Sequence, residues 1–278
     1  MTHSVILHLL ARKNKKIPLK DGKKIVLVVP GGLMSGVCGA GAMIGLYELG
    51  FANAFDSMYV ISAGLPNALY YASKQGRVGT SIYYEDCSGR KLINLARVWK
   101  MVNIDYLVHV FRFVKTLDVD AVLAAKTKIY VRLTDIRHKK VVYLEVHDVP
   151  KNEYFGLLEA ALSVPYLHPG STKIRGNQYK DPGFQEHQLV DHIQRVLDSD
   201  ATDIVIIYNH LGQVKSVRKT LHLPESRVLE IMPKPEWKIS RFETNPEKLK
   251  DTALKMGGLV KELFGEKKGI TLSYENGN

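Results

Sequence analysis

The feature that most constrains the fold is a run of branched apolar residues that ends in glycine. Residues 24–29 are KIVLVV, and the sequence Pro-Gly-Gly follows directly. Such a run predicts a strand buried on both faces, as in a parallel sheet covered by helices. A helix rich in small residues is predicted next, over residues 36–49, and Gly50 is expected to end it. The folded part of the chain is therefore expected to begin with a strand–turn–helix unit.

The same alternation of short apolar runs and helical patterns continues along the chain. A strand over 57–61 is predicted to run into a turn at Ser62 and a helix that ends near residue 72. The further predicted elements are a mostly helical middle at 77–125, a β-hairpin at 128–134 and 140–146, a helix at 154–162, a strand at 203–208 and a helix capped by Asn245. This alternation indicates an α/β fold with a mostly parallel central sheet flanked by helices.

Length and charge bear on the domain organisation and on the partners. A chain of 278 residues is long enough for one large domain. We expect that domain over residues 24–265, after a basic lead-in over 1–23 and before a short tail over 266–278. The formal net charge is +11, and much of it comes from seven basic residues near the N-terminus: Arg12, Lys13, Lys15, Lys16, Lys20, Lys23 and Lys24. They indicate either a solvated lead-in or an arm that contacts an anionic membrane surface or nucleic acid. A nucleic-acid partner is the least favoured of these and is not expected.

Cysteine usage and the N-terminus bear on the compartment. Two cysteines, Cys38 and Cys87, are too few for a disulfide framework or a four-cysteine zinc site. No apolar run reaches the roughly 18 residues that a membrane-spanning helix needs. The positive charges follow the apolar stretch at 5–11, which is the wrong order for a signal peptide. We therefore expect a cytoplasmic protein, with peripheral attachment to an anionic membrane through the basic lead-in as an option.

Three glycines, Gly31, Gly32 and Gly36, mark the turn between the first strand and the first helix. Glycine lets backbone N–H groups point into a cleft beside the positive end of the helix, where an anion can bind. A P-loop would need Lys and then Ser or Thr after Gly36, but Val37 and Cys38 stand there. The sequence therefore predicts an anion hole that is not a nucleotide site.

Ser62 is the candidate nucleophile. It stands at a predicted strand-to-helix turn, where a serine hydroxyl is raised clear of the sheet, in the frame Gly-x-Ser-x-Gly. Here Gly64 supplies the second glycine, and Val60 occupies the position of the first. The glycine loop one unit upstream is expected to lie beside Ser62 and to complete an oxyanion hole. A helix-capping role for Ser62 is the structural alternative.

Together these motifs resemble those of the patatin-like phospholipases, lipid acyl hydrolases with a Ser–Asp dyad. Residues 31–36, GGLMSG, are similar to the family's Gly-Gly-Gly-x-Arg/Lys-Gly loop, and Ser62-Ala63-Gly64 is similar to its nucleophile turn. Residues 160–165, AALSVP, are similar to the family's Ala-Ser-x-Ala-x-Pro segment. Asp181-Pro182-Gly183 resembles its Asp-Gly-Gly/Ala segment, and ISRFE at 239–243 is similar to the tail of bacterial members.

The resemblance covers about residues 24–260. It implies a patatin-like three-layer sandwich and the activity of a phospholipase A or lipid esterase on phospholipids or other lipid esters. In the implied mechanism Asp181 accepts the proton of Ser62, whose oxygen attacks an ester carbonyl. The resemblance also implies an oxyanion hole formed by Gly31, Gly32, Leu33 and Ala63. It further implies that Gly36 and Gly64 support the turn at the nucleophile. No cofactor is implied.

Four residues depart from the family's pattern. Val60 places a branched side chain where the turn has glycine, and Leu33 replaces the third loop glycine. Ser35 replaces the loop cation, and Pro182 has no N–H to offer beside the aspartate. These departures leave an alternative function open, namely a catalytically inactive patatin-like protein that binds lipid or a protein partner.

Histidines offer a rival arrangement and a possible metal site. His168 and His187 lie nearest in sequence to the segment 176–183 that contains Asp181, so a Ser–His–Asp triad is the rival to the dyad. His187 and His192 are five residues apart, which misses the i, i+4 spacing of a helical metal site, and no His-Glu-x-x-His occurs. No metal site is predicted.

Overall fold

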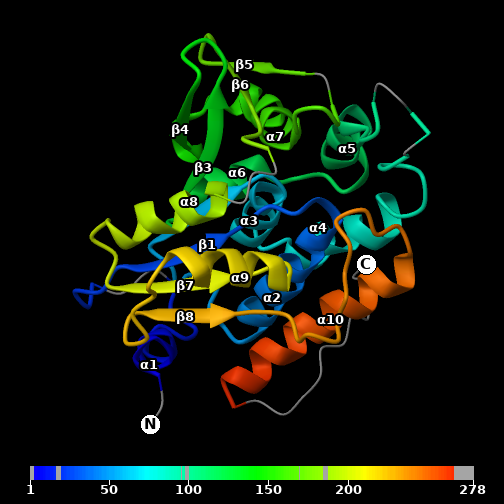
Figure 1. Cartoon of the computed structure of the whole chain (residues 1–278). Helices are drawn as coiled ribbons and strands as arrows, with labels where there is room; N and C mark the ends of the chain where they lie inside the picture. The colour runs from blue at the N-terminus through cyan, green and yellow to red at the C-terminus, as the bar shows by residue number, and fades with distance from the viewer. Residues whose placement is uncertain are drawn as a thin grey trace.

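The computed structural model describes residues 3–16, 20–94, 96–97, 100–168, 170–183 and 187–265. An eight-stranded sheet runs through the centre of this part of the chain (Figure 1). Its strands are β1 Ile25–Val29, β2 Ser57–Ile61, β3 Lys128–Asp135, β4 Lys140–Glu145, β5 Thr172–Ile174, β6 Asn177–Lys180, β7 Asp203–Ile207 and β8 Val228–Ile231. The predicted tail over 266–278 lies outside the described residues.

The strands follow the order β5-β6-β3-β2-β1-β7-β8, and β4 pairs with β3. The pairs β3–β2, β2–β1, β1–β7 and β7–β8 are all parallel, so five neighbouring strands share one direction. Strands β4, β5 and β6 add antiparallel pairs beside β3. The predicted α/β class with a mostly parallel sheet is confirmed.

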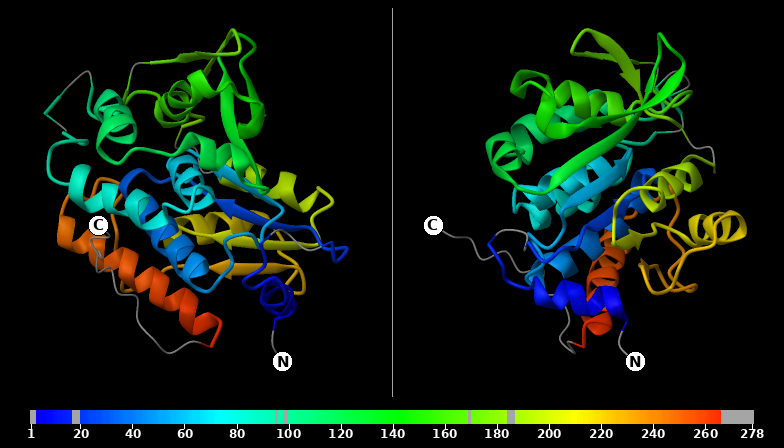
Figure 2. Two further views of the ribbon diagram at one scale, coloured as in Figure 1. Left: turned by 180° about the vertical axis from the view of Figure 1, so that it is seen from behind. Right: turned by 90° about the vertical axis from the view of Figure 1, so that its left-hand side faces the viewer.

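Helices cover both faces of the sheet (Figure 2). They are α1 Ser4–Ala11, α2 Val37–Glu48, α3 Gly64–Ala72, α4 Gly76–Ser81, α5 Ile104–His109, α6 Val119–Ala124, α7 Tyr154–Leu162, α8 His187–Leu197, α9 Leu211–Thr220 and α10 Pro246–Leu263. In β1, Val26 and Val28 pack with α8 and α9, whereas Ile25, Leu27 and Val29 pack in the main core with α2, α3 and α10. Because every residue of β1 is buried, the layers are helix, sheet and helix. Within the described residues, no helix combines the length and the apolarity needed to cross a membrane.

Helices α2 and α10 lie against each other at very short range. A Cβ added to Gly41 would lie 2.3 Å from the carbonyl oxygen of Ala253, and one added to Gly45 would lie 2.7 Å from that of Gly257. Only glycine allows two helix backbones to approach so closely. The small residues of α2 therefore fix the position of the C-terminal helix, which begins after the predicted cap Asn245.

Most predicted elements are confirmed to within two residues, including the hairpin of β3 and β4 and the helix α7. The mostly helical middle is wrong for residues 87–103, whose described part forms turns and a bridge between Ile93 and Val102. Leu92, Ile93 and Val102 are buried there at spacings that do not make a helical face. Helices α1, α8 and α9 and strands β5, β6 and β8 were not predicted.

The N-terminal segment is bound into the domain through Arg12. Val5 and Leu9 of α1 are fully buried in the main core, and so is the Arg12 side chain. The Arg12 guanidinium donates to the carboxylates of Asp21 and Asp56, with N–O distances of 2.7 and 2.6 Å. Hydrogen bonding to Arg12 lowers the pKa of Asp21 to about 2. Arg12, one of the seven basic residues of the predicted lead-in, is therefore a buried structural residue, and a solvated lead-in is wrong for this residue.

We predict that Arg12→Met lowers the free energy of unfolding by about 3 kcal/mol, because it leaves two carboxylates without their buried partner. Urea denaturation at pH 7 measures the change. Lys16→Met is the matched control, since it removes the same charge from an exposed position and should change stability by less than about 0.5 kcal/mol. Equal effects of the two substitutions would contradict a structural role for the Arg12 contacts.

Candidate active site

Three loops that carry candidate residues leave the sheet at neighbouring carboxyl ends. The glycine loop follows β1, Ser62 follows β2 and Asn209 follows β7. β1 lies between β2 and β7, and the connections from β1 and β7 leave toward opposite faces of the sheet. Ligands of α/β proteins bind at such a switch point, outside the carboxyl ends of the strands.

The register of the sheet brings Ser62 and Asp181 together. One edge of β3 is occupied by β4 over residues 130–135, so β2 and β6 must share the other edge. Along that edge β2 ascends to the pair Ile61–Arg132, whereas β6 descends to the pair Lys180–Thr134. The carboxyl ends of β2 and β6 therefore converge, and Ser62 and Asp181 line one pocket.

Ser62 has the backbone conformation of a sharp turn. Its φ is +51°, in the left-handed region that non-glycine residues seldom adopt and that is common at functional turns. A Cβ on Gly31 would lie 2.6 Å from the Cβ of Ser62, and one on Gly64 would lie 2.2 Å from the carbonyl oxygen of Val29. Val60, which departs from the family's pattern, is fully buried in the main core. Its side chain is accommodated there, two residues before the turn.

Asp181 is buried, and the pKa of its carboxyl group is close to 7. The side chain is 1% exposed, and burial raises its pKa from 3.8 to about 7, although hydrogen bonding from Ser62 and Gly183 opposes the shift. The Gly183 N–H donates to Oδ1 at 2.6 Å, so Gly183 supplies the hydrogen bond that Pro182 lacks. Oδ2 makes no hydrogen bond of ordinary geometry with the described residues. The Ser62 hydroxyl is thus near enough to lower the pKa of this carboxyl, although its position does not meet the geometry of a hydrogen bond to Oδ2.

The glycine loop presents unused backbone donors. The N–H groups of Gly31, Gly32, Leu33 and Ala63 make no hydrogen bond to any described residue. Leu33 has a φ of +50°, in the left-handed region that glycine adopts without strain. The loop therefore has this backbone conformation even though leucine stands at the position. All four residues line pockets beside Ser62. The predicted oxyanion-hole residues are therefore brought together around the nucleophile candidate.

The loop is held by the amide side chains of three residues, Asn209, Gln213 and Asn67. Nδ2 of the buried Asn209 donates to the carbonyls of Pro30 and Gly31, at 2.8 and 3.0 Å, and Nε2 of Gln213 also donates to Gly31. On the far side of the turn, Asn67 donates to the carbonyl oxygen of Gly36 at 3.0 Å. With their carbonyls fixed, the loop peptides keep their orientation. Asn209 lies 147 positions after Ser62, so no motif near Ser62 could indicate its role.

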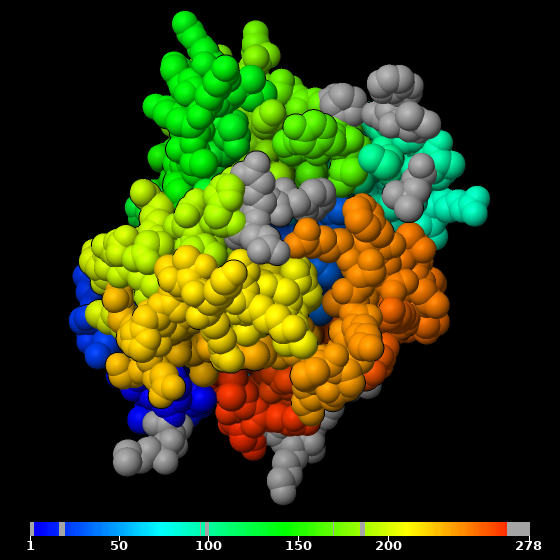
Figure 3. Space-filling model, viewed as in Figure 1, coloured from blue at the N-terminus to red at the C-terminus, as the bar shows by residue number. Residues whose placement is uncertain are grey.

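A pocket of about 90 Å³ lies on one side of Ser62. Most of its surface is apolar, and it is called the polar pocket below because its wall also carries the polar or charged side chains of Asp181, Gln213 and Arg241. Its wall includes Arg241 and His210, and Arg241 donates to Nε2 of His210 at 3.1 Å. Burial and the charge of Arg241 lower the pKa of His210 to about 4, so this histidine is neutral at pH 7. Figure 3 shows this face, where α9, in yellow, lies beside the orange segment that precedes α10, with blue atoms in the hollow between them. Arg241 therefore brings a positive charge to the pocket, whereas the predicted loop-cation position, Ser35, is buried and bonds to Gly32.

An apolar pocket of about 40 Å³ lies on the other side of Ser62. Apolar side chains dominate its wall, and they come from the loop, the helical middle and α7: Leu33, Met34, Ile82, Leu107, Phe111 and Leu162, with others. The aromatic side chains of Tyr83 and Phe111 belong to the main core and also line this pocket. Ser62 thus lies between a pocket whose wall includes charged side chains and a pocket whose wall is almost entirely apolar.

The histidines proposed for a rival triad lie elsewhere. His187 is exposed at the start of α8, and His168 lies in a cluster with Asp105 and Glu159. His210 lines the pocket of Ser62 but is bonded to Arg241. Among the described residues, none of these histidines hydrogen-bonds to Ser62 or Asp181.

Comparisons with known proteins give limited similarity. Searches against protein-family models and against curated protein sequences find no match. Among solved structures, the chain is similar to VipD from Legionella pneumophila, with a TM-score of 0.46 and 12% identity over 87% of this chain and 67% of that one. It is also similar to the type III effector protein ExoU, with a TM-score of 0.37 and 12% identity over 87% of this chain and 54% of that one. The chain spans about half the length of ExoU, and with scores this low a function has to rest on the site itself.

We predict that Ser62→Gly is more stable than Ser62→Ala by about 1 kcal/mol, because the left-handed backbone at this position strains alanine and suits glycine. Urea denaturation of the two variants measures the difference. Equal stability, or a more stable alanine variant, would show that the turn is not held in this conformation in solution.

Proposed function

We propose that the protein is a serine acyl hydrolase of the patatin-like type that acts on lipid esters, with Ser62 as nucleophile and Asp181 as base. The observation that carries the proposal is the convergence of Ser62, in a left-handed turn, with a buried carboxyl whose pKa is about 7. A base poised near the working pH is the arrangement expected for general-base catalysis. The motifs that resemble those of patatin-like phospholipases support the same reaction.

In the proposed reaction, Asp181 takes the proton from the Ser62 hydroxyl as Oγ attacks the ester carbonyl. The N–H groups of Gly32, Leu33 and Ala63 stabilise the tetrahedral oxyanion. Asp181 then gives its proton to the leaving alcohol, which departs and leaves an acyl-serine. Water attacks this ester with Asp181 again as base, and the collapse of the second tetrahedral intermediate frees the fatty acid and returns the proton to Ser62.

The two pockets divide the substrate between them. The apolar pocket would hold the acyl chain, and the polar pocket, with Arg241 in its wall, would hold an alcohol portion that carries a negative charge, as in a phospholipid. Peripheral attachment to an anionic membrane remains part of the proposal. Arg12 is unavailable for it, since its guanidinium is buried between Asp21 and Asp56, and Lys24 pairs with Asp200.

The pH dependence of hydrolysis tests the base. Because Asp181 must be ionised to accept a proton and its folded-state pKa is raised to about 7, kcat/KM should rise with pH, with a midpoint near 7, and then level off. Asp181→Asn should lower kcat/KM at pH 8 by at least about a hundredfold and abolish this midpoint. A nitrophenyl ester assay from pH 5 to 9 measures both.

The control for that assay is Asp135→Asn, which removes a carboxylate from the end of β3 that bonds to His138 and does not line the pocket. It should leave the pH midpoint unchanged. A midpoint that persists in Asp181→Asn would show that another group is the base. Hydrolysis that is absent from folded wild type at every pH would favour the inactive, lipid- or partner-binding alternative.

The size of the apolar pocket predicts a preference for short acyl chains. A cavity of about 40 Å³ is well below the roughly 150 Å³ that admits a benzene ring, so long chains must displace its wall. Leu107→Ala enlarges the pocket and should raise the rate ratio of octanoyl to acetyl ester several-fold. Leu229→Ala, an equally buried position in β8 away from the pocket, is the matched control and should not change the ratio. An unchanged ratio in Leu107→Ala would contradict the assignment of this pocket to the acyl chain.

A further inference from the structure

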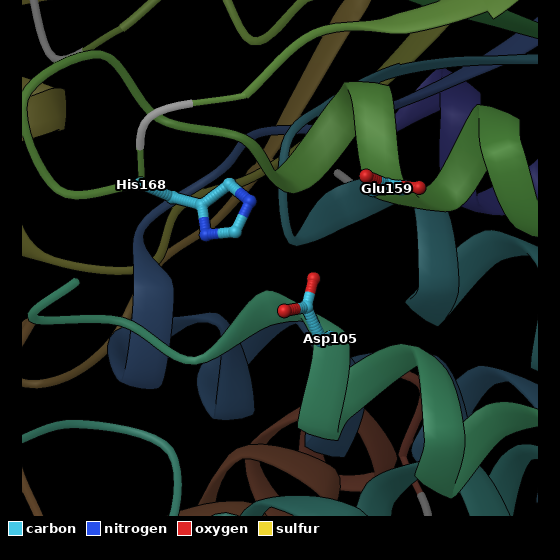
Figure 4. A group of neighbouring side chains, drawn as sticks. All are labelled: Asp105, Glu159 and His168. Atoms are coloured by element: carbon cyan, nitrogen blue, oxygen red, sulfur yellow. The ribbon is translucent and has the colours of Figure 1, made fainter.

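Away from the candidate active site, three potential metal ligands from separate segments meet beside α5 and α7. Asp105 lies in the first turn of α5, Glu159 lies in α7, and His168 follows α7. One ligand atom from each lies within 4.8 Å of both others. Figure 4 shows the three side chains turned toward a common space, with His168 facing the two carboxylates. Because these residues are 54 and 9 positions apart, no spacing motif in the sequence could indicate the cluster.

The histidine gives a second, independent indication of a ligand. His168 is 6% exposed, and its Nδ1 is buried without a hydrogen-bond partner in the described part of the chain. A buried polar atom without a partner costs free energy, so such atoms call for an explanation such as a bound ion. Asp105 is 62% exposed, which leaves the cluster open to solvent on one side. Lys100 pairs with Oδ2 of Asp105, and the carboxylate keeps a second oxygen for another ligand.

We propose that Asp105, Glu159 and His168 bind a divalent transition cation, with Zn²⁺ as the best match. One imidazole, two carboxylates and a water make a four-coordinate zinc site, and two negative ligands balance the charge of the ion. Tetrahedral ligands about 2.1 Å from zinc are about 3.4 Å apart. The present separations, which are at most 4.8 Å, therefore exceed this value by at most about 1.4 Å, and the side chains must close by that distance to bind the ion.

The position of the site gives the ion a structural role. Ile104, next to Asp105, and Leu162, one turn after Glu159, both line the apolar pocket beside Ser62. A metal that joins α5 to α7 would hold two parts of this wall together. The binding of the ion itself does not depend on the proposed hydrolase activity, so the two proposals can fail separately.

Isothermal titration of the chelator-stripped full chain with Zn²⁺ tests the site. Wild type should bind one equivalent with a Kd in the micromolar range, and Mg²⁺ at millimolar concentration should not compete. Asp105→Asn and His168→Ala should each weaken binding at least about tenfold. Asp105 is exposed, so Asp105→Asn should fold normally even if His168→Ala does not. At 100 times the Kd, Zn²⁺ should raise the Tm of wild type by about 5 °C.

His138→Ala is the control for adventitious binding, because the half-exposed His138 pairs with the buried carboxylate of Asp135 and offers an imidazole away from the proposed site. This variant should bind as wild type does. Wild-type affinity in Asp105→Asn would overturn the proposal, and so would a wild-type Kd above about 0.1 mM.

Discussion

At the carboxyl ends of β1 and β2 the backbone segments approach so closely that no side chain fits between them. Gly64 contacts the end of β1, and Gly31 contacts Ser62. A Cβ atom added to either glycine would lie less than 3 Å from an atom of the neighbouring segment. This contact holds Ser62 in its left-handed conformation and places it beside the N–H groups of the glycine loop. Asn209 and Asn67 fix the same loop from opposite sides. The geometry of the site therefore depends on how tightly two parallel strands and their turns pack.

The electrostatics of the site follow from burial. Asp181 is removed from water and no ion pair reaches it within the described residues, so its carboxyl resists ionisation. The positive charge that the glycine loop lacks at Ser35 is brought to the pocket by Arg241 from a distant segment. This places the charge on the polar side of Ser62, away from the apolar pocket. The pocket therefore has a positive charge in its wall although the glycine loop itself carries none.

The sequence predicted the elements whose signals are local. Strand β1, helix α2 and the turn at Ser62 follow from a buried apolar run, small residues and a Ser-x-Gly frame, and Asp181 follows from the resemblance of its segment. Strands β5 and β6 were missed because their short sequences, TKI and NQYK, have no apolar alternation. Asn209 and the cluster at His168 could not be predicted, since their roles arise from contacts between segments far apart in the chain.

The most direct test of the Ser62–Asp181 dyad is covalent labelling with a fluorophosphonate, followed by intact mass and peptide mapping. Wild type should gain one label on the peptide that contains Ser62, Ser62→Ala should gain none, and Asp181→Asn should react much more slowly. Circular dichroism establishes that all three are folded. A label on another residue, or folded wild type that stays unlabelled, would contradict the account.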